Sequence, residues 1–260
     1  TRMSLQQLFK SQIVITPALL IVRYCFQKLV QKVAGSGKNG KKTAESAYFG
    51  TQYLLLTIFA LYIAKDQNLF SSLAIYQDLL HDGPSSIQTL YMNLEFGVYI
   101  SASCFLFLET RKHNADFGLM IAHHVVTLTL MCLGWSHKLY NYAIFIAALH
   151  DFSDVILEYS KVLYYNNLKK VSNFVFAVFA IAFTTSRLYF FPTYFILPWY
   201  NGKFAEHLGS WPFSRWFRIV LPGLLSCLVV MHSIWSYFIL RVLYNIVKGK
   251  KAESNYEKTE

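Results

Sequence analysis

The stretch "GLMIAHHVVTLTLMCLG", residues 118–134, decides the fold because it is long and apolar and yet carries two adjacent histidines. Its length is close to what a helix needs to cross a hydrocarbon core of about 30 Å. At membrane depth the imidazoles of His123 and His124 need polar partners that lipid does not provide. The stretch therefore predicts a membrane helix that faces a cavity inside a helix bundle.

The composition of the whole chain agrees with a membrane protein. Of its 260 residues, 55% are hydrophobic and 17% aromatic, only 15% are charged, and the mean hydropathy is +0.34. A soluble domain would carry about a quarter charged residues. We therefore expect an all-α, polytopic transmembrane helix bundle that encloses a polar cavity.

Six apolar stretches are long enough to be membrane spans. They are residues 47–64, 86–108, 117–136, 139–163, 171–191 and 219–247. A seventh stretch, residues 12–30, is interrupted by Arg23, so it either spans the membrane or lies at the interface.

The spans suggest a division of the chain into three parts. Residues 1–46 would form a hydrophobic or interfacial segment followed by a basic cytosolic loop, and residues 47–247 the transmembrane catalytic domain. Residues 248–260 would form a charged cytosolic tail.

Basic residues sort by side when the loops between the spans are alternated. One side receives Lys28, Lys32, Lys38, Lys41, Lys42, Arg111, Lys112, Lys161, Lys169, Lys170, Arg241, Lys248, Lys250, Lys251 and Lys258. The other receives Lys65, Lys138, Lys203, Arg215 and Arg218. The positive-inside rule makes the first side cytosolic, with the C-terminus on it. The net charge of +10 is thus explained by juxtamembrane anchoring, and its spread over short loops argues against nucleic-acid binding.

Polar residues inside the spans point to a site. Asp151, Asp154, Glu158 and Lys161 follow one another at spacings of three, four and three, which puts them on one stripe of a helix, with His150 beside Asp151. Such a stripe must face the bundle interior, because each charged group in lipid costs some kcal/mol. The other polar residues within spans are Glu95, Arg187 and His232.

Acid and base chemistry is the interpretation that this set favours. A proton or ion pathway and a purely structural role in bridging helices are the alternatives. A metal site is not expected, either at Asp151 and Asp154 or at the histidines, because adjacent histidines diverge by about 100° on a helix and rarely ligate one ion.

Two other patterns are not expected to be functional sites. The stretch "GSGKNGKK", residues 35–42, resembles a phosphate-binding loop but has Lys42 where Ser or Thr would hold magnesium, so a flexible basic loop is expected there. The four cysteines have no metal-ligand spacing and are expected to be buried free thiols. They are Cys25, Cys104, Cys132 and Cys227.

The segments "HHVVTLTL" (123–130) and "ALHDFSDVILEYSKVLYY" (148–165) resemble the signature of the ceramide synthases among the TLC-domain membrane proteins. The segments "KKTAESAYFGTQY" (41–53), "RLYFFP" (187–192) and "HSIWSYFILR" (232–241) extend the resemblance over about residues 41–250. Three positions depart from the family pattern: Lys138, Asn141 and Ala143 stand where Asn, Arg and Gly are common. The departures suggest altered substrate handling or lost activity.

The resemblance implies a multi-pass enzyme of the endoplasmic reticulum membrane that transfers a fatty acyl chain from acyl-CoA to the amine of a long-chain sphingoid base. The co-substrate would be acyl-CoA, with no tightly bound cofactor, and membrane lipids would surround the bundle. A homo- or heterodimer is compatible with this interpretation.

The same resemblance assigns roles to the polar residues. The catalytic group would be His123, His124, His150, Asp151 and Asp154, with one of the paired histidines acting as general base or as acyl carrier and the aspartates orienting it. Donors to the oxyanion would come from His150, Tyr91, Tyr99 or Arg187. Substrate and CoA binding would involve Arg111, Lys112, Lys161, Lys169, Lys170, Arg187, Glu95 and His232.

Three rival functions stay open at this point. A lipid sensor or transfer protein would keep the fold without the chemistry, and a divergent lipid acyltransferase would use another amine acceptor. A proton-coupled transporter would show broken helices and an internal repeat, and no convincing repeat is present.

Overall fold

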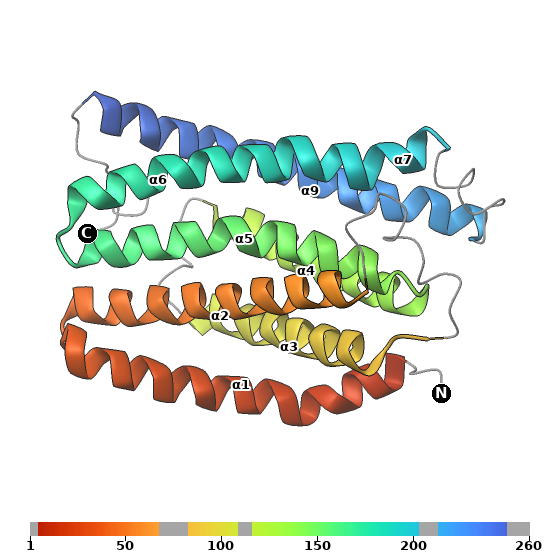
Figure 1. Ribbon diagram of the computed structural model, residues 1–260, viewed down its shortest axis with the longest axis horizontal. Helices are drawn as coiled ribbons and strands as arrows, with labels where there is room; N and C mark the ends of the chain where they lie inside the picture. Colours follow the sequence, from red (N-terminus) through yellow and green to blue (C-terminus); the bar gives the residue numbers. More distant parts are fainter. Residues whose placement is uncertain (1–4, 68–82, 109–115, 203–212, 249–260) are drawn as a thin grey trace.

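Seven long rods of helix, packed side by side, make up the described part of the computed structural model, which covers residues 5–67, 83–108, 116–202 and 213–248. The rods alternate in direction along one common axis (Figure 1). The helices are α1 (Leu5–Ala34), α2 (Lys38–Asp66), α3 (Ser86–Leu108), α4 (Phe117–Ser136), α5 (Tyr140–Tyr165), α6 (Lys169–Thr184), which continues through two π-helical segments into α7 (Leu197–Tyr200), and α9 (Arg215–Val247). The predicted all-α bundle is confirmed.

Length and composition alone assign five membrane spans. They are Leu5–Ala34, Lys38–Asp66, Phe117–Ser136, Lys169–Tyr200 and Arg215–Val247. The helices α3 and α5 do not meet this criterion, although we predicted both as spans, because they carry many of the buried polar side chains, including Glu95, Asp151 and Glu158. Both lie lengthwise in the bundle between the other helices (Figure 1), where protein rather than lipid surrounds these groups.

The uncertain stretch at residues 12–30 is part of a full-length helix, α1, which packs against α2 and α3. Its arginine does not interrupt the span, because Arg23 is buried. The guanidinium carbon lies 3.8 Å from the centroid of the Phe105 ring and 4.8 Å from that of Phe49. Aromatic faces attract a cation by their negative quadrupole. The neighbouring helices thus shield this charge from lipid.

Two buried amides join α3 to α5, and a capping box begins α3. Gln88 Nε2 donates to Asn141 Oδ1 at 2.7 Å and ties α3 to α5. Ser85 and Gln88 form a capping box at the start of α3, since the Ser85 N–H donates to Gln88 Oε1 at 2.7 Å and the Gln88 N–H donates to Ser85 Oγ at 3.2 Å. These bonds satisfy groups for which lipid has no partner.

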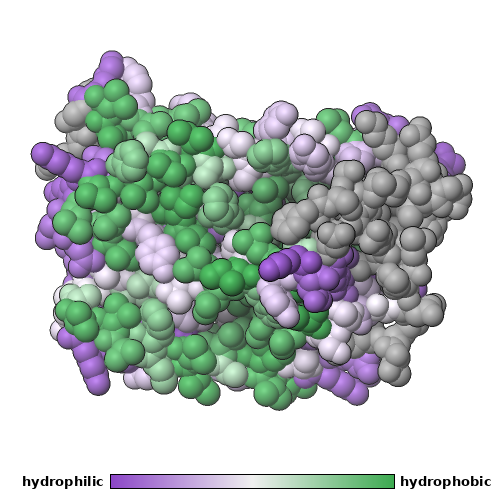
Figure 2. Space-filling model, viewed as in Figure 1, coloured by the Kyte–Doolittle hydropathy of each residue, from purple (hydrophilic) through white to green (hydrophobic). Residues whose placement is uncertain are grey.

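The outer surface is that of a protein immersed in lipid. Figure 2 shows hydrophobic side chains over most of the described middle of the bundle, with hydrophilic ones along its left end. That end, which we call the basic end, is where α1, α3, α5 and α9 finish and α2, α4 and α6 start. The described basic residues of this half that are not buried are Lys28, Lys32, Lys38, Lys41, Lys42, Lys161, Lys169, Lys170, Arg241 and Lys248. Those of the opposite half are Lys10, Lys65, Lys138, Arg215 and Arg218.

Two sequence-based expectations were wrong. The flexible basic loop at 35–42 is only three residues long, Gly35–Gly37, because α2 already begins at Lys38. Three of the four free cysteines, Cys25, Cys104 and Cys227, are exposed on the bundle surface rather than buried, and Cys132 is half-buried. An apolar thiol tolerates a lipid-facing position as readily as a core position, so hydrophobicity could not distinguish the two.

The tight connection between α1 and α2 depends on two glycines. Gly35 adopts a left-handed φ of 88°, and a Cβ atom on Gly40 would lie 1.9 Å from the Gly35 carbonyl oxygen. We expect Gly40→Ala to force these two backbones apart at a cost of about 1–3 kcal/mol. In detergent the apparent melting temperature should fall by at least about 3 °C.

Gly37→Ala is the matched control, because no atom lies within 4 Å of a Cβ at Gly37, and its φ of −66° suits any residue. Its melting temperature should stay within about 1 °C of the wild type. Equal shifts in the two variants would contradict the close approach at Gly40.

Candidate functional site

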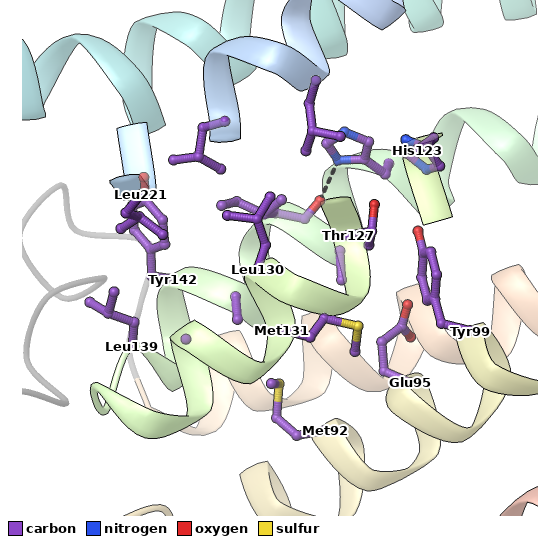
Figure 3. A pocket seen from close by; sticks show the side chains of 17 residues that line it. Met92, Glu95, Tyr99, His123, Thr127, Leu130, Met131, Leu139, Tyr142 and Leu221 are labelled. Carbon is purple, nitrogen blue, oxygen red and sulfur yellow. Dashed lines mark hydrogen bonds between the residues drawn. The ribbon is translucent and has the colours of Figure 1, made fainter. Parts of the chain in front are cut away.

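A cavity of about 60 Å³ lies among α3, α4, α5 and α9, and its wall has two chemically different ends. Figure 3 shows Glu95, Tyr99, His123 and Thr127 gathered at one end, and Leu139, Tyr142 and Leu221 at the other. The cavity is lined by Met92, Glu95, Tyr99, His123, Thr127, Leu130, Met131, Gly134, Leu139, Tyr142, Ala143, Ile146, Ala147, His150, Leu221, Leu225 and Leu228. The predicted cavity is therefore present, and its wall is largely apolar with a polar end.

The cavity extends along the bundle axis. His123 and Gly134 both line it and are eleven residues apart on α4, which is about 16 Å at the helical rise of 1.5 Å per residue. The polar end lies toward the basic end of the bundle, because α4 starts there and His123 is in its second turn. The apolar end lies near the turn from α4 to α5. Such a shape suits a molecule with a polar group at one end and a hydrocarbon chain behind it.

The two adjacent histidines have different environments. His123 lines the cavity, and its Nδ1 atom is buried without a hydrogen-bond partner. His124 Nδ1 lies 2.9 Å from Ser103 Oγ. Because the Ser103 hydroxyl donates its single proton to the Tyr99 carbonyl oxygen, His124 Nδ1 is the donor in this bond. His123 is thus available to a ligand, whereas His124 is oriented by α3.

A cluster of rings surrounds the polar end. The His232 ring is fully buried, and its centroid lies 4.9 Å from that of His150 and 6.2 Å from that of His123. Neither nitrogen of His232 has a hydrogen-bond partner. His123 also packs edge-on against Trp235 at 5.3 Å, and the Trp235 indole N–H donates to Asp116 Oδ2 at 3.1 Å. Three of the predicted histidines therefore meet in space although they come from three helices.

His150 is fixed by its own helix. Its Nδ1 donates to the Ile146 carbonyl oxygen at 2.7 Å, the bond drawn in Figure 3, so a neutral His150 presents a lone pair at Nε2. That Nε2 atom is buried and has no partner. A lone pair can accept a proton but cannot donate to an oxyanion, so the geometry suits a proton acceptor better than the donor role considered from the sequence.

The carboxylates of α5 are turned inward as predicted, but they do not bind the histidines. Asp154 Oδ1 accepts from Arg187 Nη2 at 2.6 Å, and the same guanidinium nitrogen donates to the His150 carbonyl oxygen at 3.0 Å. Asp151 is 2% exposed, and its Oδ2 atom has no partner. Glu158 pairs with the half-buried Lys161 at 2.6 Å. Arg187 therefore positions α5 and does not line the cavity.

A π-helical segment, Thr185–Phe190, places Arg187. π-Helical turns insert an additional residue into a helix and are frequent at functional sites. Here the altered register turns Arg187 toward Asp154 and packs Phe191, which is fully buried, at 5.1 Å from the His150 ring. This register could not be predicted from the sequence, because a π-turn has no simple residue pattern.

The predicted lysine and arginine contacts lie apart from the cavity. Lys169 and Lys170 are exposed at the start of α6, at the basic end of the bundle, and Lys161 lies one turn before the end of α5. Arg111 and Lys112 fall outside the described residues. The roles assigned to all these residues stay predictions.

Sequence reasoning missed the apolar wall of the cavity. On α9, Leu221, Leu225 and Leu228 precede His232 at spacings of four, three and four, so one helical stripe connects the wall to the histidine cluster. On α3, Met92, Glu95 and Tyr99 follow one another at spacings of three and four, so they also share one face of their helix. Counting along each helix from its intramembrane polar residue would have found this wall.

The three positions that depart from the expected signature gather near the apolar end. Ala143 lines the cavity beside Gly134, and Asn141 is the acceptor for Gln88. Lys138 has a positive φ of 61° in the turn between α4 and α5. Asparagine tolerates this left-handed conformation better than lysine does. The departures therefore affect the turn and the far end of the cavity, not the histidine cluster.

Comparison with known proteins decides the family. The sequence model described as the TLC domain matches residues 42–241, which is 200 of the 260 residues. The chain belongs to the TLC-domain family. Its TLC domain thus contains all the residues that line the cavity.

Curated relatives of this TLC-domain chain are named as ceramide synthases. Human ceramide synthase 4 is 31% identical over 162 residues, which cover 62% of this chain and 39% of that protein. Ceramide synthase LOH1 of Arabidopsis thaliana is 27% identical over 92% of this chain and 84% of its own length. Ceramide synthase hyl-1 of Caenorhabditis elegans is 27% identical over 84% and 61%. The chain spans about two fifths of the length of human ceramide synthases 4 and 5.

The ion pair between Arg187 and Asp154 should stabilise the TLC domain. Arg187 is 5% exposed and Asp154 27% exposed at the side chain, so Arg187→Met should leave a poorly solvated carboxylate. The cost should be about 3 kcal/mol, the low end of the range for broken buried pairs. Thermal unfolding in detergent would measure the loss. The double variant Arg187→Met/Asp154→Leu should recover part of it.

Lys170→Met is the control, because Lys170 is exposed at the start of α6 and its removal leaves no buried carboxylate unpaired. It should change the free energy of unfolding by about 0.5 kcal/mol or less. If both single variants lower stability equally, the Arg187 pair has no special structural role.

Proposed function

We propose that this protein is a ceramide synthase, which transfers a fatty acyl chain from acyl-CoA to the amine of a long-chain sphingoid base and releases ceramide or dihydroceramide and CoA. The observation that carries the proposal is the two-ended cavity, in which His123, whose buried Nδ1 atom has no hydrogen-bond partner, lines the same space as a long apolar wall. Membership of the TLC-domain family and the names of the curated relatives support it.

The cavity suggests where each part of the acyl donor would lie. The apolar wall from Leu130 to Leu139 and Leu221 would hold the hydrocarbon chain, which places the thioester beside His123 and Tyr99. CoA would then extend toward the basic end of the bundle. By the positive-inside rule that end faces the cytosol, so CoA would enter from there and the C-terminus would be cytosolic. The endoplasmic reticulum membrane is the proposed location.

His123 is the best placed of the histidines for the chemistry. As general base, its imidazole would remove a proton from the amine, which attacks the thioester carbonyl carbon and expels CoA thiolate, and that proton would pass to the thiolate. As acyl carrier, the imidazole would attack first and release CoA, and the amine would then displace the acyl group. His124, held by Ser103, would orient its neighbour in either route.

The developing oxyanion needs a donor that faces the cavity. Tyr99 meets this condition, because it lines the cavity and its hydroxyl lies on the same side as His123 and Thr127 (Figure 3). Tyr91 is fully buried and is not part of the lining. The proposed reaction requires no tightly bound cofactor.

The direct test is amide formation by the purified protein from acyl-CoA and a sphingoid base, followed by mass spectrometry of the protein. We expect amide product, and His123→Ala should lower its rate by at least about 10²-fold, the scale of a lost general base or nucleophile. An acyl adduct on the peptide containing His123 would support the covalent route, and product without an adduct would support the general-base route.

His137→Gln is the matched control, because His137 stacks on Phe217 at 3.8 Å and is not part of the cavity lining. It should keep a rate within about threefold of the wild type. No amide product over a broad panel of sphingoid bases and acyl donors would refute the proposed activity. In that case the lipid-sensing role or a different amine acceptor would become the leading hypothesis.

The proposed entry of CoA makes a separate prediction for the start of α6. Lys169 and Lys170 are exposed there beside unpaired backbone N–H groups, a setting that favours phosphate. Lys169→Gln/Lys170→Gln should raise the apparent KM for acyl-CoA by about three- to tenfold and leave that for the sphingoid base unchanged. Lys65→Gln, at the opposite end of the bundle, should change neither value. Equal changes for both substrates would place CoA elsewhere.

A further inference from the structure

Glu95 is a buried acid without a partner. It is 1% exposed and lies in the middle of α3, where it lines the cavity. Its Oε2 atom has no hydrogen-bond partner, and no lysine, arginine or histidine among the described residues forms an ion pair with it. A carboxylate in such a place is costly unless a donor or a cation reaches it.

Other acids in the bundle are not in this position. Asp154 is paired with Arg187, and Glu158 with Lys161. Asp151 is also buried and unpartnered at Oδ2, and it lies within electrostatic range of Glu95, but it is not part of the cavity lining. The two unpartnered acids together make the wall beside Glu95 attractive to a cation. Arg187 is bound to Asp154 and partly compensates the charge of Asp151, but among the described residues it forms no hydrogen bond or ion pair with Glu95.

The surroundings of Glu95 restrict what this cation can be. Tyr99 lies one turn further along α3, and His123 and Thr127 face the two residues from α4 (Figure 3). The rest of the wall is apolar, with Met92 and Met131 beside the carboxylate (Figure 3). A hydrated metal ion would find few oxygen ligands here, and no metal-binding group of His, Cys, Asp or Glu is present among the described residues. A primary ammonium group on a hydrocarbon chain fits both the charge and the apolar wall.

We infer that Glu95 is the binding site for the ammonium group of the amine acceptor and holds it opposite His123. The binding of a long-chain ammonium follows from the geometry alone, and its identification with the acyl acceptor rests on the proposed function. The acceptor amine arrives largely protonated, so a carboxylate that binds it would select amines over the neutral lipids that surround the bundle. The residue that selects for an amine, Glu95, is then on α3, and the reacting imidazole of His123 is on α4.

The bound ammonium must lose one proton before its nitrogen can attack. The carboxylate can accept it, with R–NH₃⁺ and Glu95–COO⁻ becoming R–NH₂ and Glu95–COOH. Alternatively, His123 can accept it while Glu95 stays charged and stabilises the imidazolium. Both routes conserve protons and charge. Glu95 is thus a binding and positioning residue in either route.

The test measures binding rather than turnover. Sphinganine and the diol of the same chain length that lacks the amino group would compete for the purified protein against a photoactivatable long-chain lipid. The wild type should bind sphinganine at least about tenfold more tightly than the diol, a difference of about 1.4 kcal/mol. Glu95→Gln should remove this preference and leave the affinity for the diol within about twofold. Glu95→Asp should retain part of it.

Glu158→Gln is the matched control, because it neutralises a buried carboxylate that already has a partner and is not part of the cavity lining. It should keep the wild-type preference. If Glu95→Gln does not fold, a measurement on the wild type can still test the inference. The trimethylammonium derivative of sphinganine is a permanent cation, and it should also bind the wild type more tightly than the diol. Equal affinities of cation and diol for the wild type, or an unchanged preference in folded Glu95→Gln, would overturn the inference.

These outcomes are separate from those of the activity assay. If the protein forms no amide and yet prefers the cation through Glu95, the inference holds as a long-chain ammonium site and the proposed activity fails. If amide is formed with an unchanged KM for sphinganine in Glu95→Gln, the activity stands and the inference fails.

Discussion

Polar side chains at membrane depth need partners within the protein, and this constraint determines which face each helix turns inward. On α5 it buries Asp151 and Glu158, and on α9 it buries His232 completely. On α1 it places Arg23 between aromatic rings. The helices α3 and α5 carry the most polar of these faces, which is why they pack among the others and why composition alone does not mark them as spans.

Buried polar atoms without a hydrogen-bond partner are as informative about this protein as those that have one. Most buried polar groups in proteins are hydrogen-bonded, so an unpartnered group inside a cavity is open to a water molecule or a ligand. His123 Nδ1, His150 Nε2 and Glu95 Oε2 are all buried without partners, and all three residues line one cavity. An acid, two imidazoles and an apolar wall meet there because α3 contributes Glu95, α4 contributes His123 and α5 contributes His150. This arrangement is the structural basis of the proposed acyl transfer to an amine.

A rigid frame holds the polar end of the cavity. The π-helical segment brings Arg187 to Asp154 and to the His150 carbonyl oxygen, and Phe191 packs against the His150 ring. Trp235, bound to Asp116, packs against His123 from α9. Rings and charge-assisted hydrogen bonds restrict side-chain rotation more than aliphatic contacts do, and such supporting contacts keep reactive groups in place. The apolar end is lined by aliphatic and aromatic side chains, and the Tyr142 hydroxyl there donates to the Phe195 carbonyl oxygen and accepts from the Trp199 indole N–H. At this end the chain departs from the family signature at Ala143.

The sequence by itself determined the fold class, the approximate positions of the helices and the set of polar residues that face inward. It could do so because hydrophobic length and helical spacing act locally along the chain. It also indicated the family through the histidine pair and the His150 to Lys161 stripe. It did not determine the π-helical register that turns Arg187 toward Asp154, the short turn at Gly35–Gly37, or which cysteines face lipid.

Only the tertiary structure decided how the inward-facing residues are divided among partners. It paired Asp154 with Arg187 rather than with a histidine, brought His232 between His123 and His150, and left Glu95 unpaired in the cavity. The physical reason is that the spacing of residues along one helix determines which of them share a face. Which other helix packs against that face depends on segments far away in the sequence. Those contacts are set by the packing of the whole bundle.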